Sequence, residues 1–528
     1  MKTVFGTRCE LNQNGSDGRA GDAEHFESEL LGRSRIRVNA GRYALLRQRP
    51  ACSRMRQLIA VSLFWISAFG VRAAAPAFSP TPIPTPDLRA LWTERLASIV
   101  TVEFYVQGET DRHVAIVNGT VIDRDGTIVI AGTALPTFLP PSEFKNFRIH
   151  RPGVINTEYS KGEYVGYDAV TGFHFIRVEL AGRAGLRPIT DWVVPNTSAI
   201  DIGDEVWGAG VRNKEEDFSP FLLRSHVTYI NKVPLETAFA EQPVAGPMFP
   251  IFNLHGAFVG LAMTGYGESF LAYTREERGG ALLLVSGDHS HVFRLAGDVL
   301  PYLNRVPKNQ MGRPIPWLGV AGLQPLPLEV AKYLKLENQA GIVISDIIDQ
   351  GPAEKSGLKE RDIIVALDGK PLPRFKPPQA VVGWFEKEVF QREIGSALAL
   401  TVLRGGQRVE VKPELIDEPK ILREAERKYF ERLGFSLREF VLADAVANRI
   451  KRSESDGAVV HFVKGNSPVS AAGLRAEDWV REIDGVEIKT YADAIQKLDT
   501  IEKDQTRAEF VMLVSRSGET SVLRVRLR

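Results

Sequence analysis

Short runs of apolar residues, separated by Gly, Asp and Asn, recur between residues 88 and 303. Four such runs are Ile99–Phe104, Thr120–Ile122, Thr127–Ile130 and Phe258–Leu261. Their length, their β-branched and aromatic content and their spacing predict an all-β barrel or sandwich. The last segment, His291–Leu303, has its apolar residues at helical spacing instead, and predicts a closing helix.

The C-terminal part of the chain contains one pattern twice. Gly351–Ile364 leads into Asp368-Gly369, and Ser467–Val480 leads into Asp484-Gly485. In both copies Pro-x-x-x-x-Gly-Leu predicts a short helix that ends at a Gly with positive φ, and Asp-Gly predicts a turn between strands. Each copy ends in a predicted hairpin, turning at residues 405–406 and 517–518. An internal match of this length indicates two copies of one module.

A short apolar turn containing Gly precedes each copy. These turns are Trp317, Leu318, Gly319 and Val320 in the first copy, and Leu433, Gly434, Phe435 and Ser436 in the second. Together with the repeat they resemble the PDZ domain, in the bacterial arrangement of two copies behind an HtrA/Deg serine protease. Such a turn can aim successive N–H groups at a peptide's terminal carboxylate, while the peptide adds a strand to the sheet edge. The alternative is that the glycines only serve turns in another small β domain.

The resemblance also implies which helix faces the ligand. In the second copy Thr490-Tyr491-Ala492-Asp493 has the form of a capping box and predicts a helix start. In PDZ domains the residues at this start face the ligand, so Tyr491 and Ala492 are expected to favour an apolar ligand side chain. The first copy has an insertion, residues 371–378, at the same place, and its groove is therefore either longer or partly occluded.

Four patterns in the β-rich region are similar, in order and spacing, to the barrel of HtrA proteases. They are Asn118–Ile130, Tyr167–Val178, Ile202–Gly210 and Phe252–Gly260. The resemblance implies a mainly β protein: a chymotrypsin-like double β-barrel followed by two PDZ domains, each a small β-barrel with two helices. We expect the barrels at 88–303, PDZ copies at 312–415 and 431–528, and a linker helix at 416–430.

The catalytic residues of that family do not carry over. The positions of its histidine, aspartate and serine fall on Thr133, Gly172 and Pro247. Threonine is no general base near neutral pH, and glycine cannot orient an imidazole. Proline removes the nucleophile and also a backbone N–H that an acyl-transfer site needs. No catalytic residue is therefore assigned, and His174, the nearest histidine in sequence to the aspartate position, is expected to be a packed or surface residue.

The N-terminal region has the pattern of an export signal. Met55-Arg56 is followed by the apolar run Leu58–Val71 and by Ala73-Ala74-Ala75, as in a secretory signal over residues 55–75. Residues 1–54 are then a mis-assigned or disordered extension, and the Pro-rich stretch 76–87 is a linker. The run of 14 residues is shorter than the roughly 20 that a membrane span needs. A periplasmic or secreted protein is expected, with an uncleaved membrane anchor as the alternative.

Composition narrows the chemistry further. The formal net charge of the 528-residue chain is +1, which argues against a dedicated nucleic-acid surface. Both cysteines, Cys9 and Cys52, precede the signal, so the exported chain would have no thiolate metal ligand or cysteine nucleophile. Zinc, phosphate-loop and dinucleotide motifs are missing from the sequence. We expect no metal and no cofactor.

Three functions remain open at this point. The first is an exported HtrA-like pseudoprotease that binds protein C-termini or unfolded segments, as a chaperone, adaptor or scaffold in envelope protein quality control. The second is an active HtrA/Deg-type serine endopeptidase with a rebuilt triad. The third is a structural scaffold, assembled as a homo-oligomer; the resemblance implies a trimer.

Overall fold

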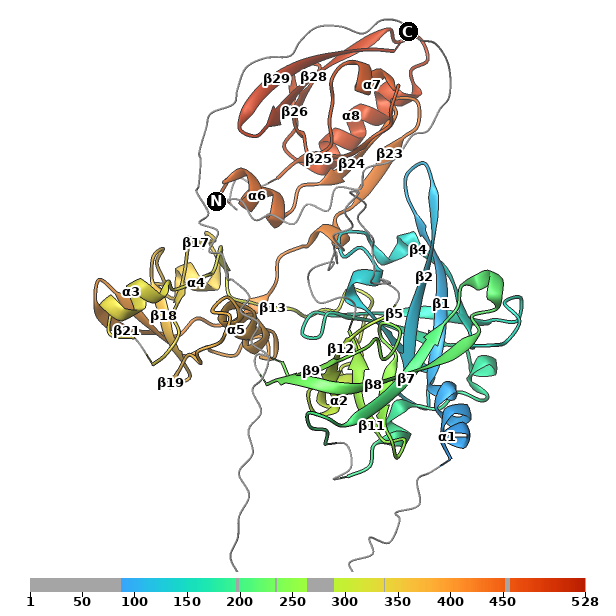
Figure 1. Ribbon diagram of the computed structural model, residues 1–528. Coiled ribbons are helices and arrows are strands. Elements are labelled where there is room, and N and C mark those ends of the chain that lie inside the picture. Colours follow the sequence, from blue (N-terminus) through green and yellow to red (C-terminus); the bar gives the residue numbers. More distant parts are fainter. Residues whose placement is uncertain are drawn as a thin grey trace, which may run out of the picture. The chain divides into compact units, whose positions relative to one another are not determined.

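The computed structural model describes residues 87–195, 199–232, 235–263, 289–336, 338–451 and 456–527 (Figure 1). The chain divides into two units, Met1–Ser79 and Pro80–Arg528. The predicted extension 1–54, the signal segment 55–75 and the Pro-rich linker up to residue 86 lie outside the described residues. None of the helices in the described ranges is long and apolar enough to cross a membrane.

The first barrel follows helix α1 (Leu88–Arg95) and closes in the order β1-β2-β3-β6-β5-β4. The strands are β1 (Ile99–Gln107), β2 (Arg112–Val121), β3 (Thr127–Ile130), β4 (Phe144–His150), β5 (Ser160–Asp168) and β6 (Phe173–Val178). Val100, Val102 and Phe104 alternate along β1 and are fully buried in the barrel interior. Closure leaves no free sheet edge, which is how this fold avoids edge-to-edge association.

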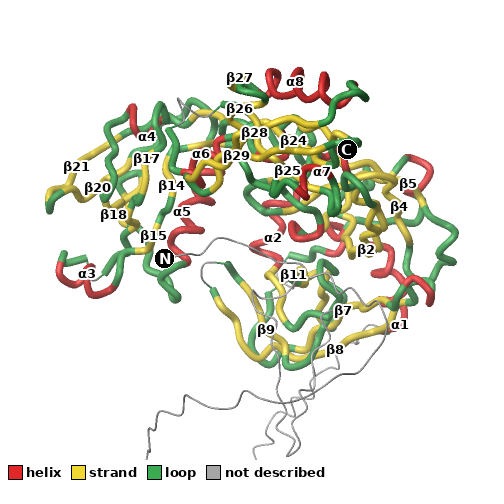
Figure 2. Tube along the Cα trace, turned by 90° about the horizontal axis from the view of Figure 1, so that it is seen from above, coloured by secondary structure: helices red, strands yellow, loops and turns green. Residues whose placement is uncertain are grey.

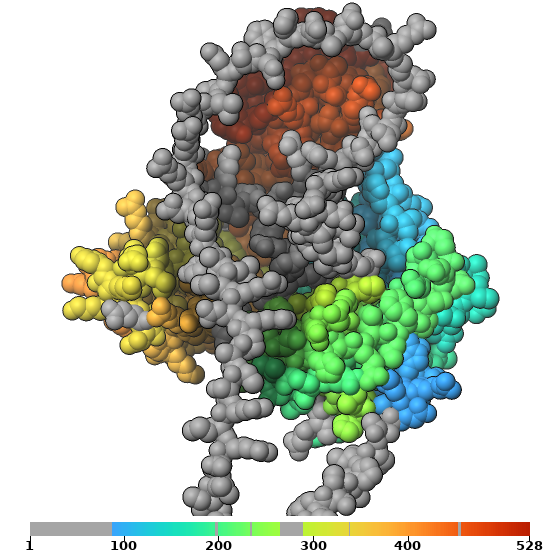
Figure 3. All heavy atoms as spheres, in the orientation of Figure 1, coloured from blue at the N-terminus to red at the C-terminus, as the bar shows by residue number. Residues whose placement is uncertain are grey.

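The second barrel closes in the order β10-β11-β12-β9-β8-β7. Its strands are β7 (Glu205–Val211), β8 (Pro220–Asn231), β9 (Thr237–Ala240), β10 (Pro250–Asn253), β11 (Phe258–Ala262) and β12 (Val292–Leu295). The barrels share one apolar cluster, to which Ile122 and Phe173 contribute from the first and Trp207 and Phe258 from the second. In the space-filling view the blue-to-cyan first barrel and the green second barrel form one continuous surface (Figure 3).

The predicted helix His291–Leu303 is wrong in its first part. Val292–Leu295 forms β12, and helix α2 covers only Ala296–Leu303. Strand β12 pairs with β11 on one side and β9 on the other. Closing the barrel therefore outweighs the local helical pattern, because β12 pairs the edges of β9 and β11 that a helix would leave open.

The first C-terminal module contains a sheet in the order β15-β16-β18-β20-β21, with β19 on β18. Its elements are β13 (Pro316–Trp317), β14 (Val320–Ala321), β15 (Gln324–Pro325), α3 (Leu328–Tyr333), β16 (Ile342–Val343), β17 (Asp346–Ile347), α4 (Pro352–Lys355), β18 (Ile363–Leu367), β19 (Lys370–Pro371), α5 (Ala380–Phe390), β20 (Leu400–Arg404), β21 (Gln407–Val411) and β22 (Ile416–Asp417). Two further pairs, β13 with β22 and β14 with β17, complete it.

The second module contains a sheet in the order β23-β24-β25-β26-β28-β29, with β27 on β26. Its elements are β23 (Arg427–Phe430), β24 (Phe435–Glu439), α6 (Leu442–Asn448), β25 (Ala458–Val463), α7 (Pro468–Ala471), β26 (Trp479–Ile483), β27 (Val486–Glu487), α8 (Tyr491–Lys503), β28 (Glu509–Arg516) and β29 (Glu519–Arg526). Figures 1 and 2 both show α8 beside the strands of this sheet, and its residues Ala494, Leu498 and Ile501 enter the module's core. Each module thus has an open sheet and a third short helix, α3 or α6, where a small barrel with two helices was expected.

The sequence repeat is also a repeat of contacts. In the first module the carboxylate of Asp362 accepts hydrogen bonds from Arg404 Nε and Nη2 at 2.8 and 2.7 Å, and Arg404 also donates to the carbonyl of Gly357. In the second, Asp478 accepts from Arg516 Nε and Nη2, both at 2.6 Å, and Arg516 donates to the carbonyl of Gly473. The two glycines have φ of +82° and +91°, as the predicted helix ends require.

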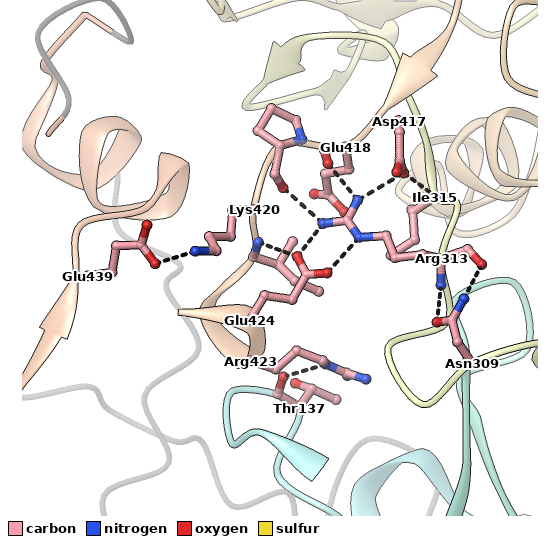
Figure 4. A network of polar contacts seen from close by, with 12 residues as sticks. Thr137, Asn309, Arg313, Ile315, Asp417, Glu418, Lys420, Arg423, Glu424 and Glu439 are labelled. Atoms are coloured by element: carbon pink, nitrogen blue, oxygen red, sulfur yellow. Dashed lines mark hydrogen bonds and ion pairs between the residues drawn. The ribbon is translucent and has the colours of Figure 1, made fainter. Parts of the chain in front are cut away.

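The predicted linker helix at 416–430 is wrong. The segment contains β22, a 3-10 turn at Leu422–Glu424 and β23. It is held by Arg313, whose guanidinium pairs with Asp417 and Glu424 and donates to the carbonyls of Glu418 and Pro419 (Figure 4). These contacts tie the segment before the first module to the segment after it. In the interior of a continuous helix the carbonyls of Glu418 and Pro419 would accept from the helix backbone instead.

Candidate functional site

A cleft of about 600 Å³ lies where the two barrels meet. Thr101, Asn118 and Thr133 line it from the first barrel, and Lys214, Pro247 and Met248 from the second, among other residues. Thr133 is exposed in the turn Gly132–Ala134, and Pro247 is half-buried in the loop before β10. Two of the three positions predicted from the triad of the resembling family therefore face one cleft.

The third predicted position lies directly behind the first. A Cβ added to Gly132 would come within 2.0 Å of the carbonyl oxygen of Gly172, so the two backbones touch beside Thr133. Gly172 has φ of +72° and its N–H donates to the carbonyl of Asp168 at 2.9 Å. The structure thus brings Thr133, Gly172 and Pro247 to one region, and none of the three side chains can transfer a proton at neutral pH.

The loop around Pro247 offers few donors to a developing oxyanion. Pro247 has no N–H. The N–H groups of Gly246, Met248 and Phe249 donate to the carbonyls of Ala209, Ala262 and Gly246 at 2.8, 2.9 and 3.0 Å. An oxyanion hole needs free N–H groups aimed into the cleft, and these four residues supply none.

His174, expected to be either packed or on the surface, is packed, with 1% of its surface exposed. Its Nε2 lies 3.2 Å from the carbonyl of Gly132 and its Nδ1 lies 2.8 Å from the hydroxyl of Tyr164. Burial and the nearby charge of Arg423 lower the pKa of His174 to about 3. The imidazole is therefore neutral, donates from Nε2 and accepts at Nδ1, and supports the turn that carries Thr133.

A buried charged cluster lies beside the cleft and has no counterpart in the sequence predictions. Glu103 and His150 are each 1% exposed, and the carboxylate of Glu103 contacts His150 Nε2 at 3.2 Å and Lys214 Nζ at 2.7 Å. Burial opposes ionisation of Glu103, but the bond and charge of Lys214 hold its pKa below the ordinary value. Burial lowers the pKa of His150 despite Glu103. The hydroxyl of Thr101 and Nδ1 of His150 are buried without a hydrogen-bond partner among the described residues.

In the first module the predicted peptide-binding turn leads into an open strand edge. Leu318 is buried in the module's core, Trp317 and Val320 are half-buried, and Gly319 has φ of +81°. The carbonyls of Leu318 and Gly319 accept from Ala353 and Ile348, while their N–H groups make no hydrogen bond within the described part of the chain. The next strand, β14, pairs only with β17 there. This arrangement suits capture of a carboxylate and addition of a strand.

A small cavity borders the insertion of the first module. A cavity of about 30 Å³ lies between β15 and the start of α5, with Leu326, Phe375 and Val381 in its lining. That volume is about one water molecule's share of the liquid. Phe375, which comes from the insertion 371–378, is buried in the module's core, and both alternatives for the groove, longer or partly occluded, stay predictions.

In the second module the corresponding turn is already engaged. Leu433 and Phe435 are fully buried, and a Cβ on Gly434 would come within 2.4 Å of Ser467 Cβ. Ser436 Oγ donates to Glu109 at 2.9 Å. The N–H of Leu433 donates to the carboxylate of Glu502. This turn therefore differs from the first in having its donors occupied.

The helix residues predicted to face a ligand lie at the start of α8. Tyr491 is half-buried and Ala492 is exposed. Thr490 caps the helix through reciprocal bonds with Asp493, as the capping box predicts. Sequence reasoning missed Asp499 and Glu502 further along α8, because a charged residue on a helix gives no signal of which distant strand it will meet.

Comparison with known proteins supports the resemblance. The PDZ domain family matches residues 325–415, within the first module. The "Periplasmic serine endoprotease DegP" of Escherichia coli (strain K12) is 29% identical over 189 residues, and that of Salmonella typhimurium is 28% identical over 183. Each match covers 35% of this chain and 34% of the relative, so it spans about a third of the length of these relatives. A "Probable periplasmic serine endoprotease DegP-like" of Pseudomonas putida (strain GB-1) is 25% identical over 307 residues, 57% of each chain.

Solved structures give weaker likenesses. An "HtrA-type protease AlgW with decapeptide" has a TM-score of 0.44 at 13% identity, over 63% of this chain and 99% of that one. A serine endoprotease from Yersinia pestis has a TM-score of 0.40 at 16% identity, over 63% of this chain and 98% of that one. Its own two barrels, the PDZ match and the sequence similarity to DegP make the chain a mainly β, HtrA-like protein that contains a PDZ domain. Its curated relatives are serine endoproteases.

Proposed function

We propose that this chain is an exported pseudoprotease that binds the C-termini of peptides or unfolded proteins and does not cleave them. The observation that carries the proposal is the turn of the first module, whose Leu318 and Gly319 N–H groups are unpaired within the described residues at the start of an open strand edge. Two N–H groups aimed at one point are a site for a terminal carboxylate. Thr133, Gly172 and Pro247, which lie together at the cleft, have no side chain that can transfer a proton, and this supports binding without hydrolysis.

Within this proposal the second repeat is also a PDZ domain, and the working location is the periplasm, as in the names of the DegP relatives. The binding partners are C-terminal tails or unfolded segments, and the role is that of a chaperone, adaptor or scaffold in envelope quality control. Assembly as a homo-oligomer would place several first-module turns on one particle and raise avidity for an unfolded chain.

The full chain can be tested with fluorescent peptides. Peptides with a free C-terminus should bind, and the same peptides with an amidated C-terminus should not, because only the free carboxylate matches the turn. Gly319→Val should abolish binding, since φ is +81° and the added Cβ would lie 3.0 Å from Pro352 Cδ. Gly369→Val is the matched control: it has φ of +74° in the same module but no atom within 4 Å of its Cβ. Equal binding of free and amidated peptides would contradict the proposal.

An active endopeptidase remains the second candidate, because one pair of residues could rebuild the chemistry. Thr101 and His150 are opposite each other in the β1–β4 ladder, and Glu103 contacts the imidazole. Thr101 Oγ1 and His150 Nδ1 make no hydrogen bond to each other in the described conformation, so this candidate also needs a shift that joins them. Threonine, imidazole and carboxylate are the parts of a nucleophile–base–orienter set. Cleavage of β-casein by the full chain that is lost in Thr101→Val would establish this candidate.

A further inference from the structure

The strand that precedes the turn follows a different path in the two modules. In the first, β13 pairs with β22, at the end of the module, and the outer edge of β14 has no strand partner in the part of the chain that the structure describes. In the second, β23 folds back and pairs antiparallel with β24, with Phe430 opposite Phe435 and Lys428 opposite Leu437. A peptide that binds by strand addition makes this kind of pairing. The chain's own residues therefore occupy the edge that an added strand would use.

The occupying strand also contacts helix α8, the other wall of the groove. Lys428 Nζ lies 2.6 and 2.8 Å from the two carboxylate oxygens of Asp499, on the third turn of the helix. Figure 1 shows β23 beside β24 in the second module. Segment Arg427–Phe430 is thus held by a sheet ladder on one side and by an ion pair to the helix on the other.

Phe430 fills the apolar end of the groove. Its side chain is 1% exposed and stacks on Phe435, with ring centroids 5.5 Å apart. It belongs to one apolar cluster with Leu433, Leu437 and Leu498, all fully buried. Lys428 lies two residues earlier on the same side of the strand. The apolar pocket therefore holds an aromatic side chain, and helix α8 pairs with a cationic side chain two positions before that residue.

In the second module, backbone N–H groups of the turn donate to a carboxylate of the chain itself, as they would to the terminal carboxylate of a bound peptide. Arg432 N–H donates to Glu502 Oε1 at 2.7 Å, and Leu433 N–H donates to Glu502 Oε2 at 3.3 Å. Gly434 N–H donates to the carbonyl of Phe430 at 2.8 Å. A carboxylate held by successive backbone N–H groups is an anion-binding nest. The N–H groups of Leu318 and Gly319 in the first module match those of Leu433 and Gly434, and they have no hydrogen-bond partner among the described residues.

We infer that Arg427–Phe430 is an intrachain ligand of the second module's peptide groove, with Glu502 in place of the ligand's terminal carboxylate. The inference rests on the proposed peptide-binding function and makes it more specific. In the described conformation only the first module accepts external peptides. The external ligand that fits the second groove is a C-terminal tail with an aromatic last residue and Lys or Arg two positions before it.

Peptide binding to the full chain, combined with hydrogen exchange, tests this inference. The probe is a fluorescein-labelled peptide ending in Ser-Ala-Lys-Tyr-Phe with a free carboxylate. Wild type should bind one peptide per chain, with slow exchange of the β24 amides. Lys428→Glu places a carboxylate against Asp499, and the 42% exposed side chain can change without loss of packing. Replacing an attractive pair by a repulsive one should speed β24 exchange roughly three- to tenfold and open a second binding site.

The charge-swapped variant Lys428→Glu with Asp499→Lys is the matched control, and it should restore slow exchange and one site per chain. Two peptide-binding sites in wild type would overturn the inference. So would a Lys428→Glu variant in which the β24 amides exchange faster without a second binding site, or one in which their exchange does not change. The proposed function fails separately, if wild type binds no peptide through the turn at Gly319. A site gained in Lys428→Glu would still support the inference in that case.

Discussion

The ion pair between Asp and Arg in each repeat predicts which substitution destabilises its module most. Asp478 has 0% of its side chain exposed, whereas Arg516, which donates two bonds to it, is 30% exposed. Replacing Arg516→Met leaves a buried carboxylate without its cation, which should cost about 3–5 kcal/mol. Asp478→Asn removes the charge but keeps the shape, and should cost about 1.5–3 kcal/mol, the worth of hydrogen bonds to a charged group. The double variant should recover about 1–2 kcal/mol relative to Arg516→Met, because no buried charge is left unpaired.

Hydrogen exchange of the full chain measures the change in the free energy of unfolding for each module separately. A loss of about 3 kcal/mol corresponds to exchange roughly 150-fold faster in the second module. The first module, unchanged, is the internal reference. The equivalent pair Arg404→Met and Asp362→Asn should reproduce the order there, since Asp362 is 1% and Arg404 30% exposed. Equal effects of the two single changes, or a double variant as unstable as the sum of both, would refute the argument from a buried charge.

Three other predictions concern the barrels and the linkers. The folded-state pKa of His174 is about 3 and its ordinary value is 6.5. The contribution of His174 to the free energy of unfolding is therefore full above about pH 6.5 and falls as the pH falls toward 3. Urea unfolding of wild type, after subtraction of the change seen in the His174→Phe variant, should show about 2 kcal/mol lost between pH 7 and 5. Pro247→Ser alone should not restore β-casein cleavage, since no base stands at Thr133; cleavage would mean that another residue acts as base. Arg313→Ala should make residues 416–424 cleavable by trypsin in limited proteolysis while the cores stay protected, and an unchanged digest would show that the four contacts of Arg313 do not hold the linker.

Local patterns predicted those features that are formed by neighbouring residues. The Asp-Gly turns, the helix-ending Gly357 and Gly473, and the capping box at Thr490 all appear where the sequence places them. The four apolar runs of the β-rich region also lie in or overlap strands, namely β1, β2, β3 and β11. These features need only a few consecutive residues to be stable.

The failed predictions all depend on a distant partner. Val292–Leu295 has helical spacing but becomes a strand because β9 and β11 need a neighbour. The end of the charged linker becomes strand β23, because it forms a ladder with β24 and because Lys428 pairs with Asp499, which lies 71 residues further on. Glu502 meets the turn at Leu433 in the same way. Contacts of this kind leave no periodic signal in the segment that makes them.

Incubation of the full chain with unfolded β-casein and a free C-terminal peptide, followed by mass spectrometry of both, tests binding without cleavage most directly. We predict intact casein, intact peptide that binds to the chain and is lost in Gly319→Val, and no covalent acyl adduct on the protein. Casein fragments that disappear in Thr101→Val, or an acyl adduct on Thr101, would contradict the account.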